Sequence, residues 1–127
     1  SNDVACKHVP RDFGRPAAQR KLFPRVEPDV MPGASSEGDR SIREAIAFLH
    51  EKVLGRYDDA DSDEVERTFD LFAAIVEDAK RQKGLDKRES YFCRQGDPAP
   101  PDDPRYTIRA WRGVVTYLLR RPEFLYE

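Results

Sequence analysis

An acidic run in the middle of the chain has part of the spacing of a calcium-binding loop. Its carboxylates fall at template positions 1, 3, 5 and 12, and they belong to Asp59, Asp61, Asp63 and Asp70. Position 6 is Glu64, where the sharp turn of the loop needs glycine, and position 12 is aspartate in place of the bidentate glutamate. A helix start whose acidic residues complement the helix dipole explains the run better, so we predict no metal ligand here.

The two histidines, His8 and His50, have no second histidine, cysteine or carboxylate at a spacing that joins two metal ligands on one helix face. We expect His50 at the edge of an apolar helix stripe, as a boundary histidine with no ligand role. The residue types of a Ser-His-acid triad are present, but Gly-x-Ser-x-Gly and a glycine-rich loop before a lysine are absent. The sequence therefore assigns no catalytic, cofactor-binding or metal-binding residue and predicts no cofactor.

Five arginines near the C-terminus are interleaved with aromatic residues, a mixture typical of nucleic-acid-binding surfaces. These arginines are Arg105, Arg109, Arg112, Arg120 and Arg121. Helical spacing puts Tyr106, Trp111 and Tyr117 on apolar stripes and leaves the first three arginines on the remaining face. Contact with solvent or with the acidic segment 58–66 accounts for these arginines, so nucleic acid is not predicted as a partner.

The only two cysteines, Cys6 and Cys93, lie in two proline-rich segments and outside any Cys-x-x-Cys spacing. No Cys-x-x-Cys-His sequence occurs either, so this chain attaches no c-type haem. A Cys6–Cys93 disulfide would tie the proline-rich N-terminal segment to the rest of the chain. The alternative is a pair of unrelated buried thiols in a cytosolic protein. We predict the disulfide.

Apolar residues that recur every three or four positions predict three main helices in an all-α bundle. They run from the capping box at Ser41 and Glu44 to Gly55, from Asp61 or Ser62 to Gly84, and from the cap Asp103, with Pro104 in the first turn, to Arg121. The third helix has two apolar stripes, which predicts a central position between the other two helices and the N-terminal segment. The residues expected in the core are Phe69, Phe72, Trp111, Val115 and Leu118.

Residues 1–38 are predicted to wrap over the bundle, because five prolines there each remove a backbone donor and fix their own φ. These prolines are Pro10, Pro16, Pro24, Pro28 and Pro32. We expect no long regular element in this segment, only a short helix over 16–22 and a loop over 31–38. A short C-terminal helical turn is predicted over 122–126, and residues 1–127 are interpreted as one domain.

The composition of the chain limits its partners. Of its 127 residues 36% are charged, the mean hydropathy is −0.78, and 22 basic residues face 24 acidic ones. We therefore predict a soluble chain with no membrane span and no overall cationic field for nucleic acid or anionic lipid. It begins at Ser1 with neither methionine nor an apolar signal segment, which is typical of a processed or cloned fragment.

Two parts of the sequence resemble a known kind of helical domain. They are HEKVLG (50–55) followed by EVERTFDLF (64–72), and DDPRYTIRAW (102–111) running on to LLRRPEFLYE (118–127). They are similar to helical domains of unknown function in large secreted bacterial proteins that also carry c-type cytochrome domains, in planctomycetes and myxobacteria. The resemblance covers residues 39–127, with a weaker echo in residues 5–23.

The resemblance implies an extracytoplasmic protein, periplasmic or at the cell surface, in an electron-transfer or polymer-processing assembly whose haem lies elsewhere. The matching motifs are packing motifs, so no functional residue is carried over. The sequence therefore favours a non-catalytic structural or partner-binding domain, whose partners are other domains or subunits of its parent protein. The alternatives are an enzyme fragment whose active site is completed outside this chain and, third, a nucleic-acid-binding module.

Overall fold

The computed structural model describes residues 2–82 and 101–122, and every element in these ranges is helical. The α-helices are α1 (Asn2–Phe13), α2 (Ser36–Leu49), α3 (Asp63–Gln82) and α4 (Thr107–Leu119). Two short turns join them, the 3-10 turn η1 (Ala17–Gln19) and the π-helical turn η2 (His50–Leu54). The predicted all-α class is confirmed, with four α-helices in the described residues in place of three.

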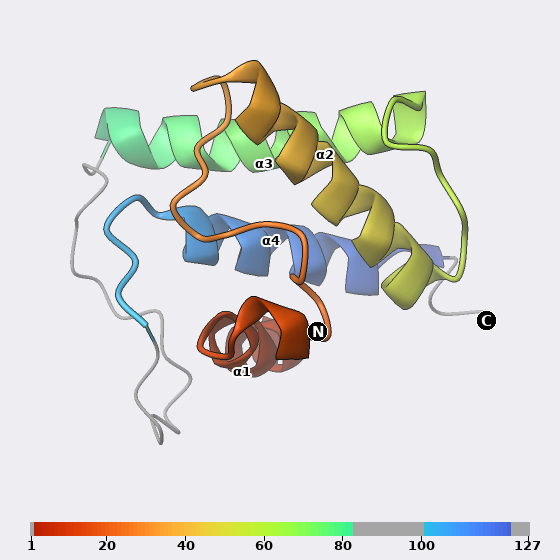
Figure 1. The fold of residues 1–127 in the computed structure, drawn as a ribbon, viewed down its shortest axis with the longest axis horizontal. Helices are drawn as coiled ribbons and strands as arrows, with labels where there is room; N and C mark the ends of the chain where they lie inside the picture. The colour runs from red at the N-terminus through yellow and green to blue at the C-terminus, as the bar shows by residue number, and fades with distance from the viewer. Residues whose placement is uncertain (1, 83–100, 123–127) are drawn as a thin grey trace.

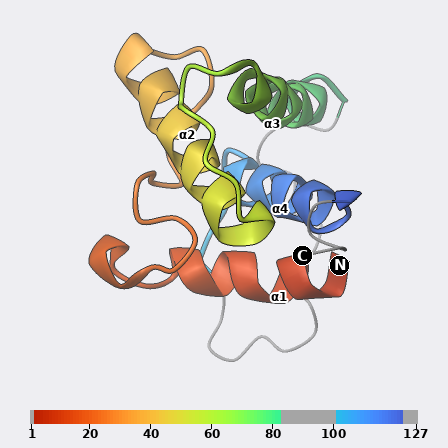
Figure 2. The same cartoon turned by 90° about the vertical axis from the view of Figure 1, so that its right-hand side faces the viewer.

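Helix α4 occupies the centre of the fold, as its two apolar stripes predicted. It contacts α1, α3 and η2. Figure 1 shows α3 and α4 running side by side while α2 crosses them at an angle, and Figure 2 shows α4 between α3 and α1. Within the described ranges, no helix has both the length and the apolar character that a membrane crossing requires.

Trp111 on α4 is the meeting point of the core. Its ring centroid lies 4.2 Å from that of Phe72 on α3 and 5.2 Å from that of Phe23 in the N-terminal segment. Phe23 in turn stacks on Phe13 of α1 at 4.4 Å. One aromatic series therefore connects α3, α4, the N-terminal segment and α1.

Four of the five residues expected in the core are buried, namely Phe72, Trp111, Val115 and Leu118. Phe69 is only partly buried, and its ring lies 4.5 Å below the guanidinium of Arg43. The adjacent inward position on α3 is taken by Thr68, whose hydroxyl hydrogen-bonds to a buried histidine. Hydrophobic spacing alone predicted that Phe69 faces the core, whereas the polar residue Thr68 takes the buried position.

The expectation that no long helix forms in residues 1–38 is wrong, because α1 spans 12 residues with Pro10 inside it. Buried residues at a spacing of four, Ala5, Val9 and Phe13, face the core, and α1 packs along α4. Tertiary packing therefore outweighs the hydrogen bond that Pro10 cannot donate. Where a helix over 16–22 was expected, only η1 forms.

The rest of the N-terminal segment is held by a buried carboxylate. Asp12, at the end of α1, accepts hydrogen bonds from the backbone N–H groups of Lys21, Leu22 and Phe23 at 2.8–3.0 Å. These three N–H groups lie in irregular backbone, where no carbonyl group of a helix accepts their hydrogen bonds. The Asp12 carboxylate accepts them instead. Phe23 is thereby fixed against Trp111.

A buried guanidinium reinforces the same segment. The Arg20 side chain, 7% exposed, donates to the carbonyl oxygens of Arg15 and Val26 and pairs with Glu27 at 3.0 Å. Its guanidinium carbon also lies 5.5 Å from the centre of the Phe13 ring. Asp12 and Arg20 together replace the regular hydrogen bonding that the prolines prevent.

Helix α2 begins earlier than the capping box at Ser41 predicted. Ser35 is the N-cap, and its hydroxyl oxygen accepts from the N–H of Gly38 at 2.9 Å. Ser41 lies inside the helix and donates to the carbonyl of Arg25. The expected loop over 31–38 therefore ends at Ser35, while the expected end at Gly55 is correct, with a left-handed φ of 69°.

Helix α4 begins four residues after its expected cap, at Thr107 instead of around Pro104. Asp103 still performs the capping function, because its carboxylate accepts from the N–H groups of Ile108 and Arg109 at 2.9 and 3.0 Å. The hydroxyl of Thr107 donates to the carbonyl of Pro28, which ties this start to the N-terminal segment. The predicted end of the second helix at Gly84 and residues 123–126 of the predicted C-terminal turn lie outside the described residues.

We expect Trp111→Ala to lower the free energy of unfolding by about 3–5 kcal/mol, because it removes the ring that joins α3 to the N-terminal segment. Chemical denaturation measures the change. Tyr117→Ala is the matched control on the same helix, where the side chain is 39% exposed, and it should cost far less. Near-native stability of the Trp111 variant would show that α4 is oriented differently.

Candidate functional site

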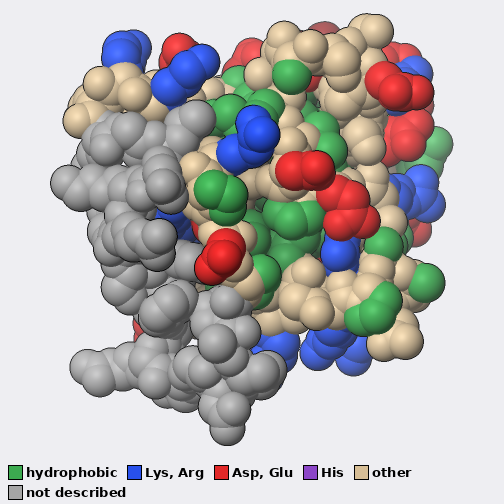
Figure 3. Space-filling model, turned by 60° about the vertical axis from the view of Figure 1, so that its left-hand side comes forward, with side chains coloured by type: hydrophobic (Ala, Val, Ile, Leu, Met, Phe, Trp, Pro, Cys, Tyr) green, Lys and Arg blue, Asp and Glu red, His purple; other side chains and the backbone are tan. Residues whose placement is uncertain are grey.

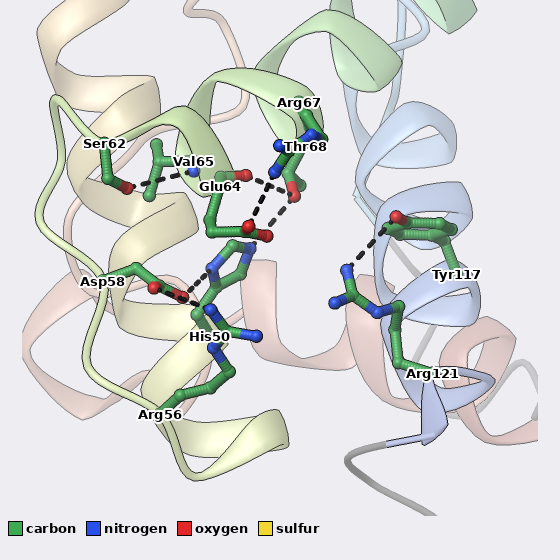
Figure 4. Close-up of polar contacts among 10 residues, drawn as sticks. All are labelled: His50, Arg56, Asp58, Ser62, Glu64, Val65, Arg67, Thr68, Tyr117 and Arg121. Carbon is green, nitrogen blue, oxygen red and sulfur yellow. Dashed lines mark hydrogen bonds and ion pairs between the residues drawn. The ribbon is translucent and has the colours of Figure 1, made fainter.

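A buried acid–histidine–hydroxyl series is the strongest candidate for a functional site in the described residues. Nδ1 of His50 lies 2.9 Å from the Asp58 carboxylate, and Nε2 lies 3.0 Å from the hydroxyl oxygen of Thr68 (Figure 4). Arg56 pairs with the second carboxylate oxygen of Asp58 at 3.2 Å. This is the connectivity of the Ser-His-Asp triads of hydrolases, with threonine as the hydroxyl residue.

The local fold brings these residues together from three segments. His50 begins η2, whose wider turns end at Gly55 in the left-handed region. The chain then runs in an extended loop, residues 55–62, which carries Asp58 back over the turn it has just left. Ser62 caps α3 through the N–H of Val65 at 3.2 Å, and the second turn of that helix presents Thr68 to the imidazole.

The protonation of the series follows from the charge on Asp58. Burial works to raise the pKa of its carboxyl group, but hydrogen bonds and positive charge from His50 and Arg56 outweigh burial and hold the pKa below its usual value. An ionised carboxylate only accepts hydrogen bonds, so Nδ1 of His50 carries the hydrogen that the two residues share. Nε2 is then the atom that faces the Thr68 hydroxyl.

The hydroxyl of Thr68 is satisfied with either protonation state of Nε2. It donates to Nε2 when that atom is bare. When Nε2 carries a hydrogen, the oxygen accepts it and the hydroxyl hydrogen turns to the carbonyl oxygen of Glu64, 3.4 Å away. Every member of the series therefore has a partner inside the fold.

Burial decides what this series can do. His50 and Thr68 are each 1% exposed, so neither the hydroxyl nor Nε2 presents a surface to a substrate. Acid–base and nucleophilic catalysis both require contact with the reacting atoms. In the described structure the series instead joins η2, the loop 55–62 and α3 by hydrogen bonds.

The expected place of His50 at the edge of an apolar stripe is therefore wrong, because the residue is buried and bonded on both nitrogens. His8 lies on the exposed face of α1. Within residues 2–82 and 101–122, no group of three or more His, Cys, Asp or Glu side chains is arranged to hold a metal ion.

The acidic run does not gather around one point. Asp58 faces His50, Asp61 forms a two-pronged pair with Arg40 at 3.0 and 3.3 Å, and Asp63 begins α3. Glu64, at the template's glycine position, pairs with Arg67 of its own helix. The carboxylates of Asp58, Asp61 and Glu64 therefore have different partners, on η2, α2 and α3 in that order.

The arginines of α4 are placed differently from expectation. Arg109 is buried, not on the solvent face, and its Nε lies 2.9 Å from the Asp103 carboxylate while its guanidinium stacks over Tyr106. Arg105 is exposed, and Arg112 is partly buried. The acidic segment 58–66 pairs with arginines of α2, of the loop 55–62 and of α3. Arg109 instead pairs with Asp103, which precedes α4.

Cys6 is buried on α1, with its sulfur 3.6 Å from a terminal nitrogen of Arg112 on α4. Cys93, the other half of the predicted disulfide, lies outside the described residues. The pairing of the two cysteines therefore stays a prediction.

Sequence patterns missed the buried polar contacts, chief among them His50 with Asp58 and Thr68. The spacing of eight between the histidine and its acid belongs to no helix or strand repeat, so only the path of the loop joins them. One signal was present: Thr68 lies on the line of Val65 and Phe72 in α3, and a hydroxyl on a buried stripe needs a polar partner.

We expect the stability of the domain to depend on pH through Asp58. Because its pKa is lower in the folded chain than the ordinary value of 3.8, the unfolded chain binds the proton first as the pH falls. The stabilisation is complete above about pH 3.8 and is lost as the pH drops through the folded value.

Asp58→Asn should therefore lower the free energy of unfolding near neutral pH. The free energy of unfolding of the variant should also fall less steeply below about pH 4 than that of the wild type, as measured by chemical denaturation at a series of pH values. Asp70→Asn, which removes an exposed carboxylate from α3, is the control and should leave both features unchanged. Parallel curves for the wild type and the Asp58 variant over the acid range would contradict the assignment.

Comparison with protein-family models, with curated proteins and with solved structures gave no match for this chain. The resemblance seen in residues 39–127, and the compartment it implies, therefore stay predictions. No residue role comes from a relative.

Proposed function

We propose that this chain is a non-catalytic helical domain that serves as a structural or partner-binding part of a larger exported protein. The observation that carries the proposal is the burial of His50 and Thr68, each 1% exposed, within the Asp58–His50–Thr68 series. The residues best suited to chemistry are bonded to one another and closed to substrate.

The other buried charged groups support the same proposal. Asp12, Asp103 and Arg109 each bind backbone groups or one another at irregular segments and helix starts. An enzyme fragment should instead have a deep pocket lined by buried charges that lack internal partners. The partners we propose are other domains or subunits of the parent protein, in an extracytoplasmic compartment.

The predicted Cys6–Cys93 disulfide belongs to this proposal, because a structural disulfide indicates an oxidising, extracytoplasmic compartment. Cys6 lies on the N-terminal helix α1, with its sulfur against Arg112 of α4. In the chain-entropy model, a crosslink that closes the long loop between Cys6 and Cys93 stabilises the folded state by roughly 4–5 kcal/mol. An oxidising compartment is where such a bond persists.

The nucleic-acid alternative is weakened by Arg109. Of the three arginines assigned to one solvent-facing stripe, this one is buried with Asp103, which leaves no continuous basic face along the first turns of α4. Counterion release requires several accessible cations on one surface. Structural or partner binding is the function that the contacts of α4 favour.

The non-catalytic proposal predicts no ester or peptide hydrolysis that depends on Thr68. The purified chain, Thr68→Ala and the hydroxyl-retaining Thr68→Ser are to be compared with p-nitrophenyl esters and a peptide substrate, after circular dichroism shows that each is folded. We expect equal background rates for all three proteins. Turnover by the wild type and Thr68→Ser that disappears in Thr68→Ala would overturn the proposal.

The disulfide predicts that native, unreduced protein has no titratable thiol under denaturing conditions. After reduction, two thiols should react, and the thermal midpoint should fall. Cys93→Ser should show one reactive thiol and the lower midpoint without any reductant. Two thiols that react in the unreduced protein would rule out the bond and remove the main support for an exported location.

A further inference from the structure

An open cavity of about 440 Å³ lies between the turn that precedes α2 and the first turns of that helix. Its lining comes from two adjoining segments and consists of Asp29, Val30, Met31, Ala34, Ser35, Glu37, Gly38 and Ser41. We call this cavity the α2 groove. Val30 and Met31 are half-buried and pack on the hydrophobic core, so the groove has an apolar floor that the fold holds in place.

Local contacts hold the backbone around the groove in place. Gly33 has a left-handed φ of 82°, and its N–H donates to Asp39 on α2 at 2.8 Å. A Cβ at Gly38 would lie only 3.2 Å from a methyl carbon of Val30, so glycine there lets Val30 approach the helix. The shape of the groove is therefore set before any ligand binds, which lowers the entropy cost of binding.

The polar lining groups fall into two classes. The serine hydroxyls are used internally, since Ser35 accepts from Gly38 and Ser41 donates to Arg25. The carboxylates of Asp29 and Glu37 are exposed and have neither an ion-pair nor a hydrogen-bond partner in the structure as described. What the groove offers a ligand is thus negative charge beside apolar surface.

Two arginines close in sequence to the groove do not neutralise these carboxylates. The Arg25 guanidinium lies over the Phe48 ring at 5.4 Å, and Arg40 is held by Asp61. Figure 3 shows one face of the molecule, where hydrophobic side chains gather near the centre with Asp and Glu side chains beside them.

We propose that the α2 groove is a docking site for a partner polypeptide that inserts a lysine or arginine next to an apolar residue. The aliphatic stem of the basic side chain packs on Val30 and Met31, and its charged end reaches the carboxylates of Asp29 and Glu37. This inference rests on the proposed partner-binding function and names the chemistry of the partner.

The test uses the folded full chain, labelled with ¹⁵N, and two synthetic peptides. The probe is acetyl-Leu-Lys-Ala-Lys-Leu-amide, and the charge-reversed peptide carries glutamate in place of lysine. We expect saturable shifts of the backbone amides of Val30, Met31 and Ala34 with the lysine peptide and none with the glutamate peptide. The affinity should fall as the salt concentration rises.

The double variant Asp29→Asn/Glu37→Gln should weaken binding of the lysine peptide by about fivefold or more, from the loss of two exposed charge pairs. The matched control is Asp70→Asn/Glu77→Gln, which removes the same charge from the exposed face of α3 and should keep the affinity of the wild type. An equal loss in both double variants, or shifts spread over the whole surface, would show nonspecific attraction and overturn the site.

The peptide titration tests the docking site, and the hydrolysis assay tests the non-catalytic function, so the two proposals can be refuted separately. If the lysine peptide leaves the amides of the groove unchanged, the docking site is refuted, whatever the hydrolysis assay shows. If Thr68-dependent hydrolysis appears, the non-catalytic function is refuted, whatever the peptide does.

Discussion

The packing of Trp111 between Phe23 and Phe72 is the interaction on which the rest of the structure depends. Helix α4 has neighbours on several sides, and the ring of its tryptophan contacts both Phe72 of α3 and Phe23 of the N-terminal segment. A large buried ring at that position removes more apolar surface from water than other residues of α4 do. The stacking of Phe23 on Phe13 extends the contact to α1. Segments that are far apart in the sequence thus meet in one core, with Trp111 among the side chains that join them.

Buried polar side chains stabilise the parts of this core that regular helices do not reach. Asp12 and Arg20 bind the irregular N-terminal backbone, Asp103 caps α4, and His50 joins the loop after η2 to α3. Each of these groups would be costly to bury without its partner. These contacts bear on the proposed function, because each of these polar side chains has its partners inside the fold. The carboxylates of Asp29 and Glu37 at the α2 groove, by contrast, are exposed.

Hydrophobic periodicity, together with helix-end residues, was sufficient to predict the helical class, the start of α3, the helix end at Gly55 and the central place of α4. It failed where another interaction outweighed a local rule. Prolines argued against α1, yet its apolar side chains at a spacing of four bury against α4. Ser41 had the capping-box spacing, but Ser35 accepts the hydrogen bond. Arg109 had a solvent-facing position and is buried by Asp103. The Asp58–His50–Thr68 series depends on the path of a loop, which no repeat in the sequence encodes.

Native-state hydrogen exchange in Phe23→Ala tests the central claim most directly, because it asks whether Trp111 couples the N-terminal segment to α3. If the coupling exists, the variant loses protection by the same free energy in the middle of α4, at Val114, and in α3, at Val76, because both then exchange only through global unfolding. If instead only residues 12–30 lose protection while Val76 keeps its wild-type value, the N-terminal segment opens by itself and the account of a single core centred on Trp111 is contradicted.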